Sequence, residues 1–213
     1  KCFKIDQKLN HKKSISRGLI NMALIYEKQN KLDKAIDYYN RCIKLGEEID
    51  YKYILGWAYN GKGIVFEKQQ KYDKALEFFE LGLEKRESMS EKLGMAQSCN
   101  SIGNLYLKLN QFKKGEVYLL RAYKIADELE NPLNIKDDAK GLAIVYEQSG
   151  QYKKSLEYHK TFKQMNDSLI NEGNIKKLAG YDIQKQYEKE KQIQELEQKK
   201  KDAVNAEEKK RQE

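Results

Sequence analysis

The sequence contains five histidine and cysteine side chains, which are the residue types most often used as zinc ligands, as nucleophiles and as acid–base groups near neutral pH. They are His11, His159, Cys2, Cys42 and Cys99. The two histidines are far apart in the sequence, and no Cys-x-x-Cys pair or Cys/His spacing typical of zinc sites is present. No glycine-rich phosphate loop following a strand is found either. The sequence therefore predicts no catalytic residue, no metal site and no cofactor, and we interpret these side chains as packing residues.

The most regular feature of the sequence is a nine-residue pattern that returns every 40 residues. At its centre is a small residue, with an aromatic residue or leucine three positions before it and a large residue four positions after it. The four copies are residues 31–39, 71–79, 111–119 and 151–159. Residues at this spacing lie on one face of a helix. A fixed period of this length indicates a solenoid, in which each unit buries its apolar face by stacking on its neighbours.

Each unit has a second small position upstream of this pattern, followed three residues later by an aromatic residue. The upstream small residues are Ala23, Gly63, Gly103 and Ala143, and those at the centre of the pattern are Ala35, Ala75, Gly115 and Ser155. Small residues at these positions predict two antiparallel helices in close contact. In the turn between the two helices, Asn30, Asn110 and Gly150 favour a left-handed residue, and Gln70 is the exception.

This pattern resembles the tetratricopeptide repeat over about residues 1–167. The likeness is carried by the small-x-x-Tyr of the first helix, the turn, the Tyr-x-x-Ala of the second helix, and a later small residue at Cys42, Gly82 and Ala122. The large aromatic residue that the family has early in the first helix is absent. The period of 40 resembles the long-helix subclass used by peptide-binding and signalling repeat proteins. The resemblance implies an all-α superhelix of helix-turn-helix repeats that binds a peptide or protein and is not an enzyme.

The repeat register divides the chain into three parts. Cys2 aligns with the later small residue of each unit, so residues 1–12 are expected to be the second half of a truncated repeat, with at least one unit upstream. Four units are expected at about 13–51, 52–90, 91–130 and 131–167. Asn131 and Pro132 are expected to be the N-cap and first residue of a helix. Residues 168–213 predict a capping helix that continues as a charged helical linker with poor heptads.

The charged tail carries a second resemblance. The repeats are followed by Ile175-Lys-Lys-Leu178 and by Tyr181-Asp-Ile-Gln-Lys-Gln-Tyr187. This arrangement is similar to the sensor regions of bacterial membrane-bound signalling proteins of the histidine kinase type. The resemblance implies a ligand-sensing input region outside the cytoplasm, joined to the membrane and an output domain through an unseen downstream segment. The alternative is a cytoplasmic tetratricopeptide repeat adaptor or peptide-pheromone receptor without a membrane link.

The first resemblance also implies which residues face the groove, because the first helices of such repeats line the concave side. The groove candidates are Arg17, Asn21, Trp57, Asn60, Ile64, Gln97, Asn100, Asn104, Lys108 and Lys140. The amides of Asn60 and Asn100, at equivalent positions, can each donate to and accept from a peptide backbone, or they are simply solvated. Trp57, the only tryptophan, is either an anchor for the ligand or an edge packing residue. The family's clamp for a C-terminal carboxylate is absent, because Ile20 and Leu24 occupy its first positions.

Composition narrows the class of partner. Apolar residues at 39% and charged residues at 35% are typical of a thin helical stack with much solvated surface. The net charge of +8 suits an acidic peptide or a nucleic acid, but Lys and Arg are interspersed with Asp and Glu in every unit. Without a basic stripe interleaved with aromatic residues, the sequence predicts no nucleic-acid partner. A homodimer through the C-terminal helix is a further hypothesis.

Overall fold

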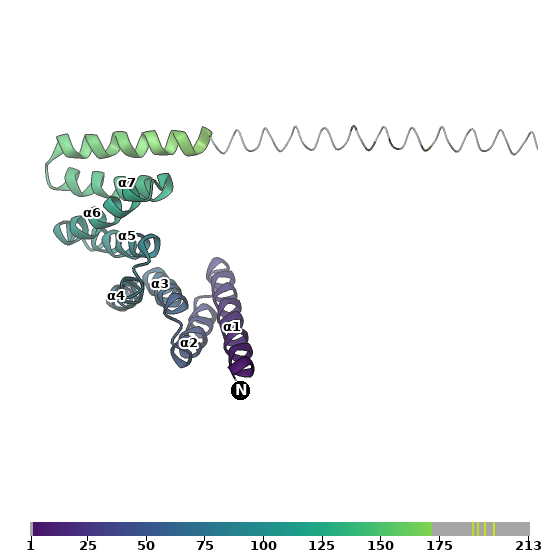
Figure 1. Ribbon diagram of the computed structural model, residues 1–213. Helices are drawn as coiled ribbons and strands as arrows, with labels where there is room; N and C mark the ends of the chain where they lie inside the picture. The colour runs from purple at the N-terminus through teal and green to yellow at the C-terminus, as the bar shows by residue number, and fades with distance from the viewer. Residues whose placement is uncertain (1, 172–188, 190, 192–193, 195–197, 199–213) are drawn as a thin grey trace, which may run out of the picture. The chain divides into compact units, whose positions relative to one another are not determined.

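The computed structural model describes residues 2–171 and the separate residues 189, 191, 194 and 198, with side chains from residue 11 on. The helices are α1 (Cys2–Lys28), α2 (Leu32–Glu48), α3 (Lys52–Lys68), α4 (Tyr72–Glu87), α5 (Lys92–Lys108), α6 (Phe112–Glu128) and α7 (Pro132–Gln148), followed by a helical segment over 152–171 (Figure 1). The described residues contain no strand, and the predicted all-α repeat architecture is confirmed. The chain divides into two compact units, Lys1–Asn166 and Asp167–Glu213.

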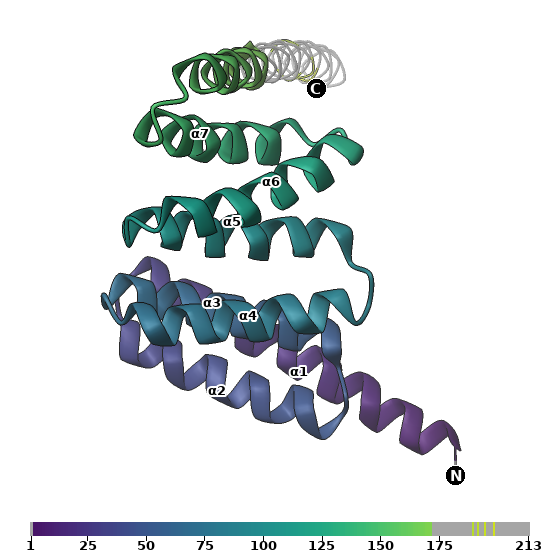
Figure 2. The same cartoon turned by 90° about the vertical axis from the view of Figure 1, so that its left-hand side faces the viewer.

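Within the first unit, the helices pack in antiparallel pairs that stack in chain order (Figure 2). The first helices of successive repeats also contact one another, α1 with α3, α3 with α5 and α5 with α7. The second helices α2, α4 and α6 make no such contacts with one another. The first helices therefore form a continuous inner layer, and the second helices form a more widely spaced outer layer.

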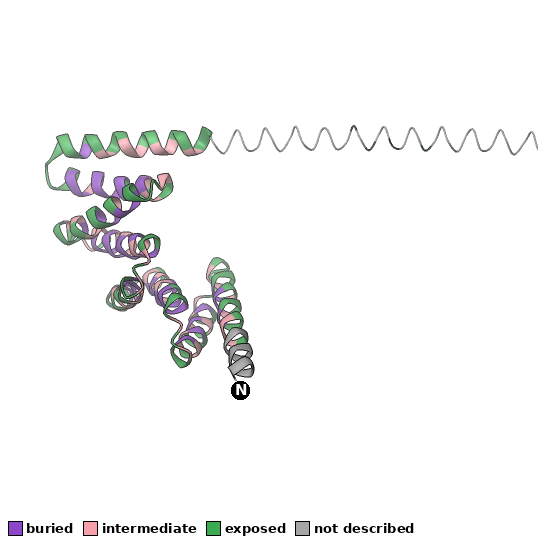
Figure 3. Ribbon diagram, in the orientation of Figure 1, coloured by how far each residue is buried: buried purple, intermediate pink, exposed green. Residues whose placement is uncertain are grey.

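The small positions of the sequence pattern lie where helices approach most closely. Ala23, Ala35 and Ala75 have no exposed surface, and the buried residues concentrate on the sides where helices face each other (Figure 3). A Cβ atom on Gly63 would lie 2.5 Å from Phe79 Cδ1 and 3.2 Å from the carbonyl oxygen of Ala75. A side chain at residue 63 would therefore force the Phe79 ring and the backbone of α4 to shift.

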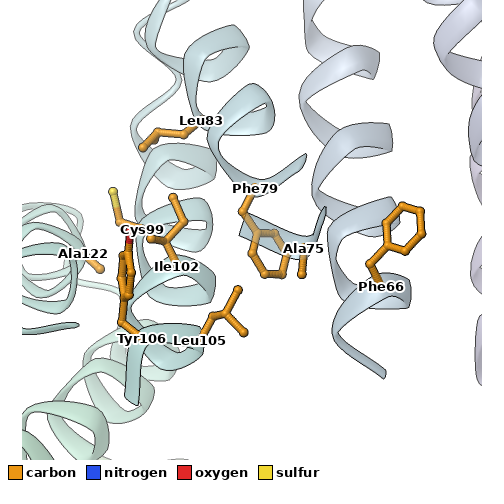
Figure 4. Close-up of a cluster of buried hydrophobic side chains, with 9 residues drawn as sticks. All are labelled: Phe66, Ala75, Phe79, Leu83, Cys99, Ile102, Leu105, Tyr106 and Ala122. Atoms are coloured by element: carbon orange, nitrogen blue, oxygen red, sulfur yellow. The ribbon is translucent and has the colours of Figure 1, made fainter. Parts of the chain in front are cut away.

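Aromatic and aliphatic side chains fill the space between the helix layers. In the cluster around Phe79, side chains come from α3, α4, α5 and α6 (Figure 4). Burial of one such side chain contributes roughly 1.5–3 kcal/mol to the free energy of unfolding. Cys42 and Cys99 are free and fully buried, as expected for packing residues, and burial raises the pKa of the Cys99 thiol to about 11. Both thiols therefore stay protonated at neutral pH.

The turns between paired helices all contain a left-handed residue. Asn30, Asn110 and Gly150 have φ values of 56°, 57° and 71°, which confirms the prediction for these positions. The prediction that Gln70 is an exception is wrong, because Gln70 has a φ of 59°. Stacking of the flanking helices fixes this conformation, and the strain of placing a side chain there is offset elsewhere. Asn131 accepts a hydrogen bond from the backbone N–H of Asn134 at 3.1 Å, so its predicted role as N-cap is confirmed.

The N-terminal part of the chain differs from its prediction. Residues 1–12 were expected to belong to a separate, preceding helix, but α1 runs through this boundary to Lys28 without a turn. Asn10 is helical, although Asp50, Ser90 and Glu130 at equivalent positions have positive φ. A continuous helix pairs more backbone groups than a turn does.

Both histidines differ from their interpretation as packing residues. His159 is exposed, whereas Tyr39, Phe79 and Leu119 at equivalent positions are fully buried. No further helix pair that would cover this position is part of the described chain. His11 is exposed as well, on the part of α1 that has no preceding helix beside it. In the described chain, both histidines therefore lie at the surface.

The C-terminal expectations fall mostly beyond the described part of the chain. The capping helix and linker predicted over 168–213 lie almost wholly outside the described residues. Among those that are described, no helix is long and apolar enough to span a bilayer.

Candidate functional site

Three depressions follow one another along the layer of first helices. The N-terminal depression, of about 330 Å³, lies on α1 and α3 and is lined by Arg17, Ile20, Asn21, Leu24, Tyr53, Ile54 and Trp57. The central pocket, of about 300 Å³, lies on α3, α5 and α7 and is lined by Trp57, Asn60, Ala96, Gln97, Asn100, Ser101, Asn134, Asp137 and Asp138. The C-terminal depression, of about 470 Å³, is lined by Glu67, Asn100, Asn104, Leu107, Lys108, Asp137, Lys140, Gly141 and Ile144. Because each shares lining residues with the next, they form one continuous groove.

The groove collects nine of the ten residues that the sequence singles out. The nine are Arg17, Asn21, Trp57, Asn60, Gln97, Asn100, Asn104, Lys108 and Lys140. The tenth, Ile64, lines none of the three depressions and instead packs, half-buried, against the hydrophobic cluster around Phe79. The repeat register therefore places the groove residues together, and Ile64 belongs to the core.

Two of the predicted groove amides are bonded to each other and to a buried carboxylate. Asn104 Nδ2 donates to Asn100 Oδ1 at 2.9 Å, and Asn100 Nδ2 donates to Asp138 Oδ1. Asn104 thereby fixes the orientation of the Asn100 amide, and Asn100 fixes one oxygen of Asp138. Since its amide nitrogen is already engaged, Asn100 positions Asp138 rather than presenting a fully free amide to a ligand.

Three residues that line the central pocket each carry a buried polar atom with no hydrogen-bond partner among the described residues. These atoms are Asn60 Oδ1, Asp138 Oδ2 and Asn134 Nδ2. Asp138 is 1% exposed, and burial raises the pKa of its carboxyl group to about 7, with the hydrogen bond from Asn100 opposing this shift. Leaving buried polar atoms unpaired costs free energy, so such groups are rare outside sites that receive a ligand or water.

Asp138 was not singled out from the sequence, although the repeat register contains a signal for it. At the equivalent positions the other units have Gly18, Ala58 and Ser98. These residues are small, and Ala58 and Ser98 are fully buried. The sequence shows that Asp138 departs from this pattern, but only the structure shows that its carboxylate lies at the bottom of a pocket.

Arg86 is a second buried charge that the repeat pattern did not reveal. It has no exposed surface and donates through Nη1 to the Gly94 carbonyl oxygen at 2.7 Å and to Ser98 Oγ at 2.9 Å. Its Nε lies 3.7 Å from Glu91 Oε2. The guanidinium also lies 5.3 Å from the centre of the Trp57 ring, which is 36% exposed. Trp57 is thus held against Arg86 and is still accessible from the groove.

The sign of the charge changes along the groove. Arg17 lies in the N-terminal depression, where its Nη2 donates to Tyr51 Oη at 3.2 Å. Of the described side chains that line the central pocket, the only charged ones are the carboxylates Asp137 and Asp138. In the C-terminal depression, Lys108 forms an ion pair with Glu67 across neighbouring first helices. The central pocket is therefore locally acidic in a chain of net positive charge.

Comparison with known proteins agrees with the repeat geometry. Two profiles described as tetratricopeptide repeat match residues 14–88 and 96–128, together just over half of the chain. The chain belongs to the tetratricopeptide repeat family. Repeats of this family are generally protein-interaction modules that bind peptides or proteins. A search of curated protein sequences finds no match for this tetratricopeptide repeat chain.

Solved structures with the same fold come from several kinds of protein. BtubC (BKLC) from P. vanneervenii has a TM-score of 0.68 and 19% identity over 74% of this chain and 65% of its own. Aspartyl phosphate phosphatase F from Bacillus subtilis has a TM-score of 0.69 and 16% identity over 73% of this chain and 41% of its own. A signal transduction ATPase with numerous domains (STAND) protein with a tetratricopeptide repeat sensor, from Pyrococcus horikoshii, has a TM-score of 0.65 and 21% identity over 75% of this chain and 25% of its own. This tetratricopeptide repeat chain thus spans less than two thirds of each, and at these identities the likeness shows the fold alone.

Proposed function

We propose that this chain is the peptide- or protein-binding input region of a bacterial signal-transduction protein. The observation that carries the proposal is the continuous groove on the first helices, which combines an accessible tryptophan with polar atoms that lack partners among the described residues. A groove of this kind can hold an extended segment by bonding its backbone and can select it through side-chain pockets. The role is binding, with no chemical step assigned to these repeats.

The signalling part of the proposal rests on two lines of support. The charged segment after the repeats resembles the linkers of bacterial sensor proteins. One protein of the same fold, the STAND protein from Pyrococcus horikoshii, has a tetratricopeptide repeat sensor. By analogy, occupancy of the groove would be passed to residues 167–213 and from there to an output domain.

Peptide binding in the groove is tested by selecting random dodecapeptides, displayed on phage, on the complete 213-residue chain. A variant with Trp57→Ala and Asn60→Ala removes the accessible ring and one free acceptor from the groove. The matched control carries Val117→Ser and Leu156→Ser, two exposed apolar residues on second helices, 65% and 56% exposed. We expect the wild type and the control to enrich the same peptides and the groove variant to lose them. Equal enrichment by all three proteins, or no enrichment by the wild type, would refute the proposed site.

The membrane-bound sensor and the alternative, a cytoplasmic adaptor or peptide-pheromone receptor, differ in their flanking sequence. The intact open reading frame distinguishes them. A secretory signal upstream and about twenty apolar residues soon after Glu213 would support the sensor outside the cytoplasm. Polar sequence on both sides would refute the membrane link and favour the adaptor or receptor, acting on partners inside the cell.

A further inference from the structure

The central pocket has an arrangement of unpaired groups that selects for a positive charge. Two of its three unpartnered atoms, Asn60 Oδ1 and Asp138 Oδ2, are hydrogen-bond acceptors. Among the described residues, no lysine or arginine lines the pocket, and Asp137 adds a second carboxylate at its rim, where its side chain is 53% exposed. Asp137 Oδ1 lies 3.4 Å from Lys136 Nζ and is thus paired, so the unpaired negative charge of the pocket is that of Asp138. This charge would repel an anionic group, which disfavours the acidic segment that the net charge of the chain suggests.

We propose that the central pocket binds the ammonium or guanidinium group of a lysine or arginine side chain of the bound peptide, with the Asp138 carboxylate as its counter-ion and Asn60 Oδ1 as a second acceptor. This proposal rests on the proposed peptide-binding function and names the chemical group that the groove recognises. The volume of about 300 Å³ holds the end of one long side chain, several times the roughly 30 Å³ that a water molecule occupies in the liquid.

Asp138 is placed for this role by contacts that folding alone does not require. The equivalent positions Gly18, Ala58 and Ser98 show that a small uncharged residue satisfies helix packing here. Asn100 bonds only Oδ1 of Asp138 and is itself held by Asn104, so the second oxygen keeps a fixed direction and has no partner among the described residues. Such a fixed acceptor loses little conformational entropy when a cation arrives.

The free chain keeps this carboxylate in an unfavourable state that a bound cation would relieve. Burial raises the pKa of Asp138 to about 7, and the nearby charge of Asp137, on the same helix, raises it as well. Within the described part of the chain, Cys99 of α5 and Tyr123 of α6 also couple electrostatically to Asp138, and neither carries positive charge. Measurements at pH 8 therefore place Asp138 in its ionised form, which is the form that pairs with a cation.

The Trp57 side of the pocket supports the same class of ligand. Trp57, whose ring centre lies 5.3 Å from the Arg86 guanidinium, lines both the N-terminal depression and the central pocket. The methylene groups of a lysine or arginine side chain pack well against an aromatic ring while the charged end reaches a carboxylate. The arrangement thus provides an apolar wall for the stem and an acidic floor for the head group.

The test uses this 213-residue chain and peptides that are selected on it at pH 8. Where the selected peptides share a lysine or arginine, each is synthesised in two forms, with lysine or with uncharged norleucine at that position. On the wild type we expect norleucine to weaken binding by roughly tenfold to a hundredfold, as for a buried charged hydrogen bond. On Asp138→Asn the two peptides should bind equally. Asp138→Ser, which restores the residue type of position 98, is a second variant that keeps the fold. Asp73→Asn, at an exposed carboxylate of α4 that lines none of the three depressions, is the control that should retain the lysine preference.

The remaining outcomes separate this inference from the proposed function. Selected peptides that share no lysine or arginine, or a norleucine effect that survives in both Asp138 variants, would overturn the proposal while leaving peptide binding intact. Failure of the wild type to select any peptide would overturn the proposed function and this inference together. If Nα-acetyl-lysine amide alone competes as well as the peptide, cation binding by the central pocket is supported. The ligand of the pocket would then be a small amine and not a peptide.

Discussion

Replacing Asp138 with asparagine should change how the stability of this protein depends on pH. Asparagine has nearly the same size and can accept the hydrogen bond from Asn100, but it does not ionise. In the wild type, burial raises the pKa of Asp138 from 3.8 to about 7. Between these two values the folded chain keeps a proton that the unfolded chain has lost, so the free energy of unfolding falls as pH rises.

The magnitude follows from the size of the shift. One pKa unit corresponds to about 1.4 kcal/mol, so a shift from 3.8 to about 7 corresponds to about 4 kcal/mol. The stabilising contribution of the protonated carboxyl is fully present below pH 4 and is lost as pH rises through 7. Asp138→Asn lacks this pH dependence, so we expect it to match the wild type near pH 4 and to exceed it by about 4 kcal/mol at pH 8.

The assay is urea unfolding followed by circular dichroism at pH 4, 5, 6, 7 and 8. The quantity to compare is the difference in unfolding free energy between Asp138→Asn and the wild type at each pH, because other titrating groups cancel in this difference. Asp137→Asn is the matched control, since it makes the same change in net charge at a neighbouring side chain that is 53% exposed. Its difference from the wild type should vary much less with pH.

A difference that stays constant from pH 4 to pH 8 would refute the reasoning. It would mean that the Asp138 carboxyl titrates as it does in water, and hence that solvent reaches the bottom of the central pocket. A carboxyl carbon resonance of Asp138 that titrates near pH 4 would show the same thing independently. A difference of the opposite sign would mean that a positive charge pairs with Asp138 in the free chain.

Four other substitutions test the turns and the packing of the helices. Gln70→Gly should raise the free energy of unfolding by roughly 1 kcal/mol, because residue 70 has a left-handed backbone; an unchanged urea midpoint would contradict this. Gly63→Ala should lower the free energy of unfolding by roughly 1–3 kcal/mol through overpacking. Gly18→Ala, with no atom within 4 Å of the new Cβ, should raise it by up to about 1 kcal/mol. Equal effects of the two substitutions would argue against the close contact at residue 63. Arg86→Ala should lower the free energy of unfolding by roughly 3 kcal/mol. It should also shift the fluorescence emission of Trp57, the only tryptophan, to longer wavelength. Unchanged emission would show that the guanidinium does not shield the ring.

The repeat register could be predicted because it depends on local, periodic features of the sequence. Small residues such as Ala23 and Ala35 recur in phase with aromatic residues, and the same helix–helix contact is built in each unit. Nine of the ten groove candidates follow from that register, since residues equivalent in a solenoid face the same side. Ile64 lies outside the three depressions and packs against the hydrophobic cluster, because the neighbours of a side chain at the border between core and groove depend on the tertiary structure.

Turn geometry shows where local preferences stop being sufficient. Asn30 and Gly150 predict left-handed turns from their own conformational preferences, but Gln70 has no such preference and adopts the same φ. Its conformation is imposed by the packing of the helices on either side. Likewise, Asn10 has a residue type suited to a turn but continues α1 as a helix.

The sequence by itself determined the helix pairs, their order and the face on which the groove lies, because each of these depends on spacing that repeats four times. The tertiary structure alone decided the chemistry of the groove, because that chemistry depends on residues that do not repeat. Asp138 stands where the other units have small residues, and the properties of both Asp138 and Arg86 depend on their burial and on partners from other helices. Asn100, predicted as a groove amide from its register, proves to be the residue that orients Asp138.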